Sequence, residues 1–203
     1  MVNMEEKEHN CLNPSESIYD YLSSDYKRIS LKKNNYICSV NDLIYKAAPK
    51  NIKYYLDAGG GDGLRTEEIA SVLAPDYTFL IDSSSKMINL AKKRSFDRVI
   101  KTEIIDFNSE IKFDLITSLW NVFGHIETRE KRLKSIENLK NHLSPNGKMI
   151  FDVNNRYNIT YGVLNVIKNL INDKILKSVS SGWYSFEYDK KRFPVYLHSP
   201  AEI

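Results

Sequence analysis

The sequence of 203 residues predicts an α/β fold in which a doubly wound, parallel sheet occupies residues 52–154. Three observations support this prediction. Apolar, strand-like runs alternate with segments of helical periodicity, an order that is typical of parallel sheets with crossover helices. Glycines at alternate positions follow the first run. An acidic residue ends each of the first three runs, at Asp57, Asp82 and Asp106. Because the carboxyl ends of parallel strands meet at one edge of a sheet, these carboxylates are expected in a single cleft.

The first strand is predicted at Ile52–Leu56, and the residues after it are the most informative part of the sequence. Asp57 follows the strand, and a helix-like pattern opens at Thr66. The glycines between them are Gly59, Gly61 and Gly63. A strand, a glycine turn and a helix N-terminus hold adenosine-containing cofactors in α/β folds, because the ligand can approach free backbone amides there. An ordinary tight turn is the alternative, and three spaced glycines after an acidic residue make it the weaker interpretation.

The spacing of these glycines distinguishes between cofactors. A dinucleotide fingerprint requires Gly-x-Gly-x-x-Gly or Ala, and from Gly59 its last position falls on Leu64, which does not fit. The observed Gly-x-Gly-x-Gly, with Asp57 two residues before it, resembles motif I of the class I S-adenosylmethionine-dependent methyltransferases. The resemblance implies a Rossmann-like sheet and S-adenosylmethionine as the cofactor. It places Asp57 by the methionine amino group, and Gly59, Gly61 and Gly63 beneath the methionine and ribose portions.

The second strand is predicted at Tyr77–Ile81 and ends at Asp82. This lies about 20 residues beyond the glycine turn, where an acidic side chain is expected to bind ribose hydroxyls. Ser83–Ser85 can cap the helix that follows. Ser83 and Met87, just beyond Asp82, are included among the expected cofactor contacts.

The third strand is predicted at Val99–Ile105, with Asp106 and Phe107 at its end. The resemblance implies that Asp106 faces the adenine amino group and that Phe107 packs beside the ring. Taken singly, each acidic residue at a strand end could be a helix cap or a solvated loop carboxylate. Their recurrence after three successive strands favours a shared cleft.

The fourth strand is predicted at Phe113–Leu119 and continues into Trp120–Ile126. Ligands of open α/β sheets bind beyond the carboxyl ends of the strands, so this segment should face the reacting methyl group, and Leu119 should contact the cofactor. The segment lacks the Asp/Asn-Pro-Pro-aromatic signature of amino-directed nucleic-acid methyltransferases. Asn121–Ile126 instead resembles small-molecule methyltransferases such as those acting on glycine or on amino sugars.

His125 is the histidine with a chemically sensible place for catalysis. Its ordinary pKa, about 6.5, suits a general base that takes a proton from an amine or a hydroxyl. One alternative is a loop histidine bonded to backbone. Another is catalysis by positioning alone, since in-line alignment can supply much of the barrier reduction. The other histidines, at positions 9, 142 and 198, have no partners at metal-ligand spacing, so no metal site is expected.

The N-terminal part is predicted to consist of a flexible polar lead, residues 1–15, and a helical cap, residues 16–48, broken near Lys32–Asn35. The tyrosine and aspartate pairs between residues 19 and 26 resemble a segment that small-molecule methyltransferases place over the cofactor. The resemblance gives Tyr19 a hydroxyl beside the sulfonium methyl group. The alternative is a helical stripe of tyrosines packed on the core.

The C-terminal part is predicted to begin after a helix at Glu130–Leu143 and a fifth strand at Lys148–Asn154. Residues 155–197 then form a lid or insertion, with a helix over residues 159–176 and a hairpin at residues 183–197. The helix is either a lid over the substrate entrance or plain packing, and its place after the fifth strand favours the lid.

The chain is interpreted as a single domain whose last residues differ most from the family pattern. In that family the sheet continues with a helix and an antiparallel hairpin, in strand order 3-2-1-4-5-7-6. Here His198–Ile203 resembles only the first turn of that helix. We therefore expect a sheet that lacks these elements, in a chain that is truncated or completed by another chain. The fifth strand would be an exposed edge, with poor solubility, self-association or coverage by the hairpin as the consequence.

The composition of the chain limits which partners and functions are expected. The net charge of +3, from 29 basic and 26 acidic residues, is too small to indicate a nucleic-acid partner. No secretory signal or membrane-spanning run is visible, and the two cysteines form no motif, so a cytoplasmic protein without a membrane partner is expected. The favoured function is methyl transfer to a nitrogen or oxygen of a small-molecule acceptor.

Three alternatives remain for the function. One is a methyltransferase acting on protein or RNA, which a basic surface stripe would support. Another is a non-catalytic protein of the same fold that binds the cofactor or only a partner. A nicotinamide oxidoreductase is weaker still, because Leu64 interrupts the dinucleotide fingerprint and no Tyr-x-x-x-Lys pair is present.

Overall fold

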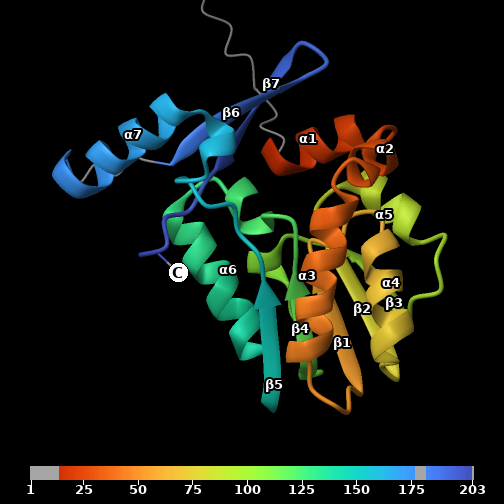
Figure 1. Cartoon of the computed structure of the whole chain (residues 1–203). Helices are drawn as coiled ribbons and strands as arrows, with labels where there is room; N and C mark the ends of the chain where they lie inside the picture. Colours follow the sequence, from red (N-terminus) through yellow and green to blue (C-terminus); the bar gives the residue numbers. More distant parts are fainter. Residues whose placement is uncertain (1–13, 177–181, 203) are drawn as a thin grey trace, which may run out of the picture.

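A computed structural model describes residues 14–176 and 182–202 of the chain (Figure 1). Five strands form one parallel sheet in the order β3-β2-β1-β4-β5. The strands are β1 (Tyr54–Ala58), β2 (Tyr77–Asp82), β3 (Arg98–Lys101), β4 (Phe113–Ser118) and β5 (Leu143–Phe151). The chain starts in the middle of the sheet, winds to one edge and then to the other, so the predicted doubly wound α/β fold is confirmed.

Helices precede, connect and follow these strands. The helices are α1 (Pro14–Leu22), α2 (Tyr26–Leu31), α3 (Asn34–Ala47), α4 (Leu64–Leu73), α5 (Ser85–Ala91), α6 (Arg129–Asn141) and α7 (Val163–Ile171). Single turns lie at η1 (Ile104–Asp106), η2 (Val122–His125) and η3 (Ile159–Tyr161), with a π-helical turn at η4 (Asn172–Leu176). The predicted break in the helical cap is confirmed, since α2 ends at Leu31 and α3 begins at Asn34.

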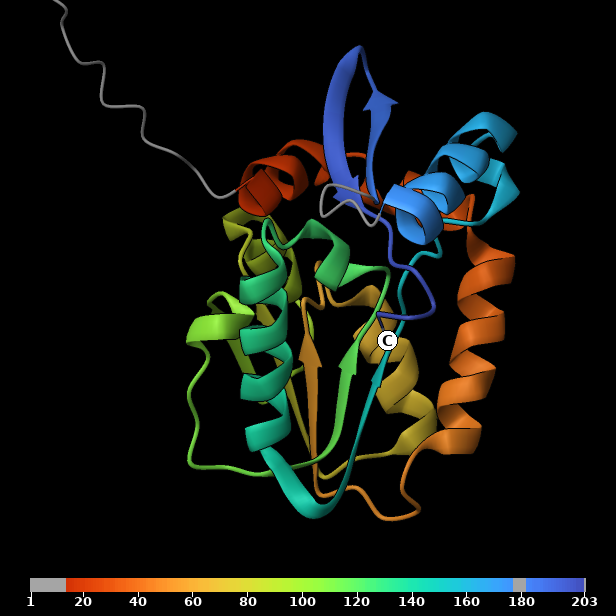
Figure 2. The same ribbon diagram turned by 90° about the vertical axis from the view of Figure 1, so that its left-hand side faces the viewer.

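The two faces of the sheet are covered by different helices (Figure 2). Along each strand alternate side chains point to opposite faces. Leu56 packs toward Leu139 of α6 on one face, whereas Tyr55 packs toward Ile44 of α3 and Ile69 of α4 on the other. Both faces are therefore closed, which explains the continuous apolar runs of the strands. The carboxyl edge of the sheet is left for a ligand.

The third strand is shorter than the sequence predicts. β3 ends at Lys101, and the chain then forms η1 instead of continuing to Ile105. The cause is a long-range contact, since the Asn138 side chain of α6 donates hydrogen bonds to the carbonyls of Ile104 and Phe107. Those carbonyls are turned toward α6 and cannot extend the ladder with β2.

The fifth strand begins earlier than predicted. β5 covers Leu143–Phe151, and a register shift between Phe113 and Leu115 of β4 admits the extra residues as a bulge. The predicted turn at Ser144–Gly147 is thus an irregular stretch inside the strand. Among the described residues, no strand pairs with the outer edge of β5.

The C-terminal hairpin forms a sheet of its own. β6 (Trp183–Tyr188) and β7 (Lys191–Tyr196) are antiparallel, and the turn residues Asp189 and Lys190 both have positive φ, 47° and 60°. The two strands lie within the hairpin predicted at residues 183–197. The hairpin packs against α1, so the expectation that it could cover the edge of β5 is wrong. Among the described residues, no helix combines the length and apolar character needed to cross a membrane.

Candidate functional site

The glycine turn lies between β1 and α4, at the carboxyl edge of the sheet. Gly59, Gly61 and Gly63 have φ of 78°, 58° and 77°, a region that favours glycine. A Cβ atom on Gly59 would lie 2.7 Å from the Val122 side chain. The Gly59 amide donates a hydrogen bond of 2.8 Å to the carbonyl of Ile81 in β2. The turn is therefore fixed against β2 and the segment after β4, as a cofactor cradle requires.

The first acidic residue, Asp57, is buried under this turn. It accepts hydrogen bonds from the hydroxyls of Thr66, at 2.6 Å, and Thr117, at 2.7 Å. Burial raises the pKa of the Asp57 carboxyl above its ordinary value, and these two hydroxyls oppose the shift. Asp57 thus joins β1, β4 and α4 beneath the cradle.

The second acidic residue, Asp82, is bound by backbone amides at the end of β2. Its two oxygens accept hydrogen bonds from the amides of Gly61, at 2.9 Å, and Ser84, at 2.8 Å. Burial raises the pKa of Asp82 to about 6, and the two amides oppose the shift. The carboxylate is rigidly oriented, and its spare lone pairs remain available for hydroxyl donors.

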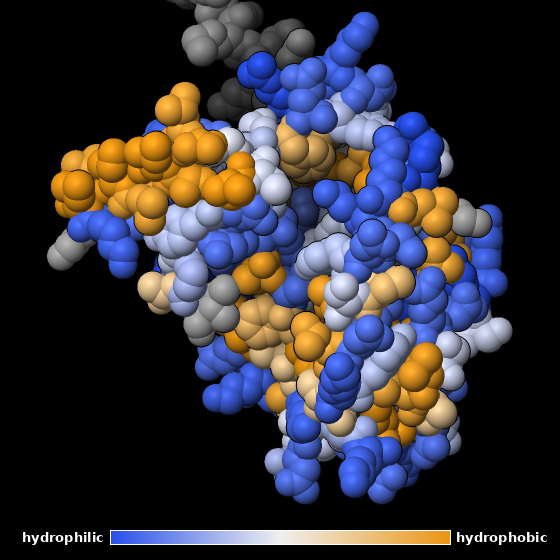
Figure 3. Space-filling view, in the orientation of Figure 1, coloured by the Kyte–Doolittle hydropathy of each residue, from blue (hydrophilic) through white to orange (hydrophobic). Residues whose placement is uncertain are grey.

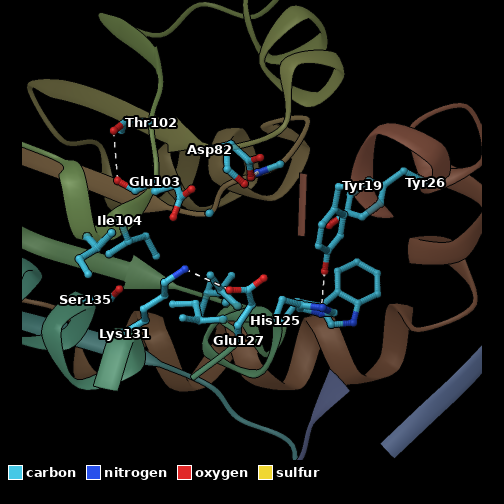
Figure 4. A pocket seen from close by; sticks show the side chains of 18 residues that line it. Tyr19, Tyr26, Asp82, Thr102, Glu103, Ile104, His125, Glu127, Lys131 and Ser135 are labelled. Carbon is cyan, nitrogen blue, oxygen red and sulfur yellow. Dashed lines mark hydrogen bonds and ion pairs between the residues drawn. The ribbon is translucent and has the colours of Figure 1, made fainter. Parts of the chain in front are cut away.

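Two adjoining cavities open above the turn. The first takes in about 820 Å³ and the second about 650 Å³ of empty space, and both figures include space that is open to solvent. Shared lining residues join the cavities at Tyr26, Gly59, Leu119 and Trp120. The first cavity extends over Asp82 toward residues 102–105 and α6 (Figure 4). The second extends over Asp57 toward α2, α3 and α4.

Eight of the predicted site residues line these cavities. They are Tyr19, Asp57, Gly59, Gly61, Asp82, Ser83, Leu119 and His125. The structure brings them together from α1, the glycine turn, the end of β2 and the segment after β4. Their roles toward a ligand remain predictions.

Four other predicted residues do not line either cavity. Gly63 faces Phe96, and Met87 is fully buried in the core. Asp106 is exposed, and Phe107 packs in the core. The early end of β3 explains the last two positions, because residues 102–105 take the place at the cavity wall.

His125 and Tyr19 form a pair at the end of the first cavity. The Tyr19 hydroxyl and His125 Nε2 are hydrogen bonded at 3.0 Å, and the other ring nitrogen, Nδ1, is buried without a hydrogen-bond partner among the described residues (Figure 4). Burial lowers the pKa of His125 to about 4, so the expected value near 6.5 is corrected. Burial, followed by the charges of Asp82 and Asp152, raises the pKa of Tyr19. Both side chains are neutral at pH 7.

Helix α1 holds Tyr19 over the cavity from two sides. On one side the Asp20 carboxylate accepts hydrogen bonds from the Ser84 hydroxyl, at 2.5 Å, and the Lys86 amide, at 3.0 Å. On the other side the Tyr21 hydroxyl donates to Asp189 in the hairpin turn. The hairpin thus supports α1 from outside, while Tyr19 and Tyr26 of the cap line the first cavity, so the helical-stripe alternative accounts for only part of this segment.

Sequence reasoning missed Arg65, in the first turn of α4. Its Nε donates to Asn41 of α3 at 2.9 Å, and one terminal nitrogen lies 3.8 Å from Asp152. Both terminal nitrogens are buried without hydrogen-bond partners among the described residues, and the side chain lines the second cavity. A buried, under-bonded guanidinium indicates an anionic partner. The sequence feature that could have identified Arg65 is a basic residue two positions after Gly63.

Sequence reasoning also gave Trp120 little weight. Trp120 and Asn121 have φ of 70° and 59°, an unfavourable backbone for non-glycine residues. The Asn121 backbone amide donates a hydrogen bond to Asp152 at 2.7 Å, and the Asn121 side-chain oxygen accepts one from the Asn154 amide at 2.8 Å. These two hydrogen bonds hold the conformation. The strain directs the Trp120 ring to 5.5 Å from the ring of Tyr26, where both line the two cavities.

Comparison with known proteins agrees with this architecture. Residues 56–149 match a family model described as a methyltransferase domain. No curated protein sequence shows a significant match. The structure titled "DhpI-SAM-HEP complex" is 16% identical with a TM-score of 0.70, and the match covers 97% of this chain and 86% of that one.

Two further solved structures are similar over a smaller share of their length. CalS10, an amino pentose methyltransferase from Micromonospora echinaspora, is 18% identical with a TM-score of 0.54, over 74% of this chain and 58% of that one. The plantazolicin methyltransferase BpumL is 25% identical with a TM-score of 0.57, over 76% and 63%. Residues 56–149 therefore carry a methyltransferase domain, and the solved structures share the fold of the chain.

Proposed function

We propose that this methyltransferase acts on a nitrogen or oxygen of a small-molecule acceptor. The observation that carries the proposal is the first cavity, in which the unpartnered Nδ1 of His125 is buried beside the glycine turn. Tyr19 and Tyr26 of the helical cap narrow this cavity, which favours a small acceptor. Two similar proteins, CalS10 and BpumL, are described as methyltransferases of an amino pentose and of plantazolicin.

The residues of the two cavities fit S-adenosylmethionine. Asp82, oriented by two amides, can accept hydrogen bonds from both ribose hydroxyls. Gly59 and Gly61 leave backbone free of Cβ atoms where the ligand passes between the cavities. Arg65 has buried donors for which a methionine carboxylate is the matching partner. We therefore assign the adenosine part to the first cavity and the methionine part to the second.

The cofactor supplies an electrophilic methyl group on a sulfonium ion. The electron-rich rings of Tyr26 and Trp120, at the junction of the cavities, suit a cation. In the transfer, the acceptor nitrogen or oxygen forms a bond to the methyl carbon while the bond from carbon to sulfur breaks, and the acceptor loses a proton.

His125 is placed to take that proton. The tautomer with hydrogen on Nε2 donates to the Tyr19 oxygen and leaves the Nδ1 lone pair free to act as the base. Because the pKa of His125 is about 4, the imidazole ring is neutral before the substrate binds. Its main contribution is then a correctly oriented hydrogen-bond acceptor for the proton of the substrate. The rest of the acceleration is expected from alignment of the reactants.

The test is an acceptor screen with small amines, amino sugars and phenols, in which formation of S-adenosylhomocysteine is followed. We expect turnover with a subset of these compounds. Calorimetric titration with S-adenosylmethionine and with NAD is run in parallel. Cofactor binding without turnover on any acceptor would support a binding protein of this fold, and tighter binding of NAD would contradict the assignment of the cavities.

A further inference from the structure

Helix α7 leaves most of its apolar side chains exposed. An ordinary surface helix buries an apolar stripe and exposes its polar side chains. In α7 the half-buried side chains are Val166 and Asn169, and the following turn adds the half-buried Asp173. Asn169 donates to the Arg156 carbonyl, and Asp173 pairs with the Arg156 guanidinium at 2.9 Å. Arg156 is only 2% exposed, so these contacts anchor one side of the helix to a buried charge.

The outward face is aliphatic (Figure 3). Eight residues of η3, α7 and η4, between 39% and 83% exposed, make up this α7 face: Ile159, Val163, Leu164, Ile167, Leu170, Ile171, Ile175 and Leu176. Figure 3 shows them as a continuous band that projects from the side of the molecule. Because the inner contacts hold the helix, it cannot rotate to bury this band.

The size of the α7 face is informative. Complete burial of a large aliphatic side chain contributes up to about 3 kcal/mol, at about 25 cal/mol per Å² of apolar surface. A fully exposed side chain of this kind therefore presents roughly 120 Å² to solvent. At the observed exposures the eight side chains present roughly 600 Å², which is the upper limit for the largest patch of a typical monomer. Two such faces in contact would bury roughly 1,200 Å², the lower limit for a specific and stable protein interface.

We propose that the α7 face pairs with the same face of a second copy of this chain across a two-fold axis. Leu164, Ile167 and Ile171 recur at three and four residues, a ridge that packs into the matching groove of another helix. The exposed polar neighbours are the neutral Asn165 and the cations Lys168 and Lys174, which lie beside the aliphatic face and stay in solvent at the rim of such an interface.

A lipid surface fits the α7 face less well. Peripheral helices that bind anionic membranes carry clusters of Lys and Arg and aromatic side chains at the boundary. Between residues 159 and 176 the basic residues are Lys168 and Lys174, with Asp173 beside them, and the α7 face itself holds no aromatic residue.

The test is the concentration dependence of the molar mass, measured by light scattering and sedimentation. The double variant Leu164→Glu, Ile167→Glu should raise the dimer dissociation constant at least tenfold. The matched control is Leu43→Glu with Val72→Glu, on α3 and α4, where the side chains are 64% and 58% exposed, against 83% for Leu164 and 48% for Ile167. This control should dimerise like the parent. Equal melting temperatures and equal affinity for S-adenosylmethionine establish that all three proteins are folded.

Three results would overturn the proposal. One is a parent protein that stays monomeric at all concentrations reached. Another is a dimer that the α7 variant retains, which would point to the unpaired edge of β5. The third is a monomer that binds vesicles of anionic phospholipid through Leu164 and Ile167.

Discussion

Replacement of Asp82 by alanine tests the assignment of the first cavity most directly. The carboxylate would accept two charge-assisted hydrogen bonds from the ribose, and each such bond contributes about 1.5–3 kcal/mol. Part of this gain is lost because Asp82 already accepts bonds from the amides of Gly61 and Ser84. We therefore expect the dissociation constant of S-adenosylmethionine to rise at least tenfold, which corresponds to about 1.4 kcal/mol.

The assay is calorimetric titration, and the chain offers a matched control. Asp97 also accepts a backbone hydrogen bond of β2, from the amide of Thr78 at 2.7 Å, but it lies outside both cavities. Asp97→Ala should lower stability without a change in cofactor affinity. Equal affinity of Asp82→Ala and the parent would refute the assignment.

The same carboxylate gives a pH dependence with a definite sign. Burial raises the folded pKa of Asp82 to about 6, so the ligand-free protein takes up a proton there as the pH falls. Ribose hydroxyls donate to the ionised form, and affinity should therefore decrease as the pH falls below about 6, by up to about tenfold per pH unit. The contribution of Asp82 to the free energy of unfolding changes in the opposite direction from the affinity. This contribution is present at low pH and is lost as the pH rises through about 6. In Asp82→Asn the decrease in affinity should disappear, and its persistence would assign the effect to another group.

Two other substitutions separate chemistry from binding. His125→Ala should lower turnover by roughly 10²–10⁴ with nearly unchanged cofactor affinity, and a loss below about threefold would leave positioning as the mechanism. Arg65→Ala should weaken S-adenosylmethionine at least tenfold and leave adenosine binding unchanged, because Arg65 lines only the second cavity. Equal weakening of both ligands would mean that Arg65 is structural.

The sequence predicts the parts of this site that depend on local geometry. Gly59 and Asp82 follow directly from the order of strand, turn and helix, so their place at the carboxyl edge could be derived. Asp106 could not be placed, because Asn138 of α6, 32 positions away, ends the third strand early. Arg65 was missed for a similar reason, since its burial depends on Asn41 of α3 and on Asp152, just after β5. Contacts between distant segments decide these positions, and no local pattern records them.

Helix α7 shows the same limit in another form. Its apolar spacing predicts a helix, and the structure confirms one over Val163–Ile171. Most of its apolar side chains nevertheless stay exposed, because the helix is anchored to the buried Arg156 through Asn169 and, in the next turn, Asp173. Arg156 lies between β5 and the helix in the sequence, and its burial comes from Tyr196 and Glu202. The periodicity identifies the helix, whereas distant acceptors determine its orientation.

The charge of the two cavities leads to a final prediction. Six acidic side chains line them, against the two basic side chains of Arg65 and Lys131. This surplus of carboxylates favours a sulfonium cation, whereas the product of transfer, S-adenosylhomocysteine, has lost that charge. Salt screens the attraction, so rising ionic strength should weaken S-adenosylmethionine more than S-adenosylhomocysteine. Titrations of both ligands over a salt series measure the two slopes. Identical slopes would show that the acidic lining does not act on the sulfonium.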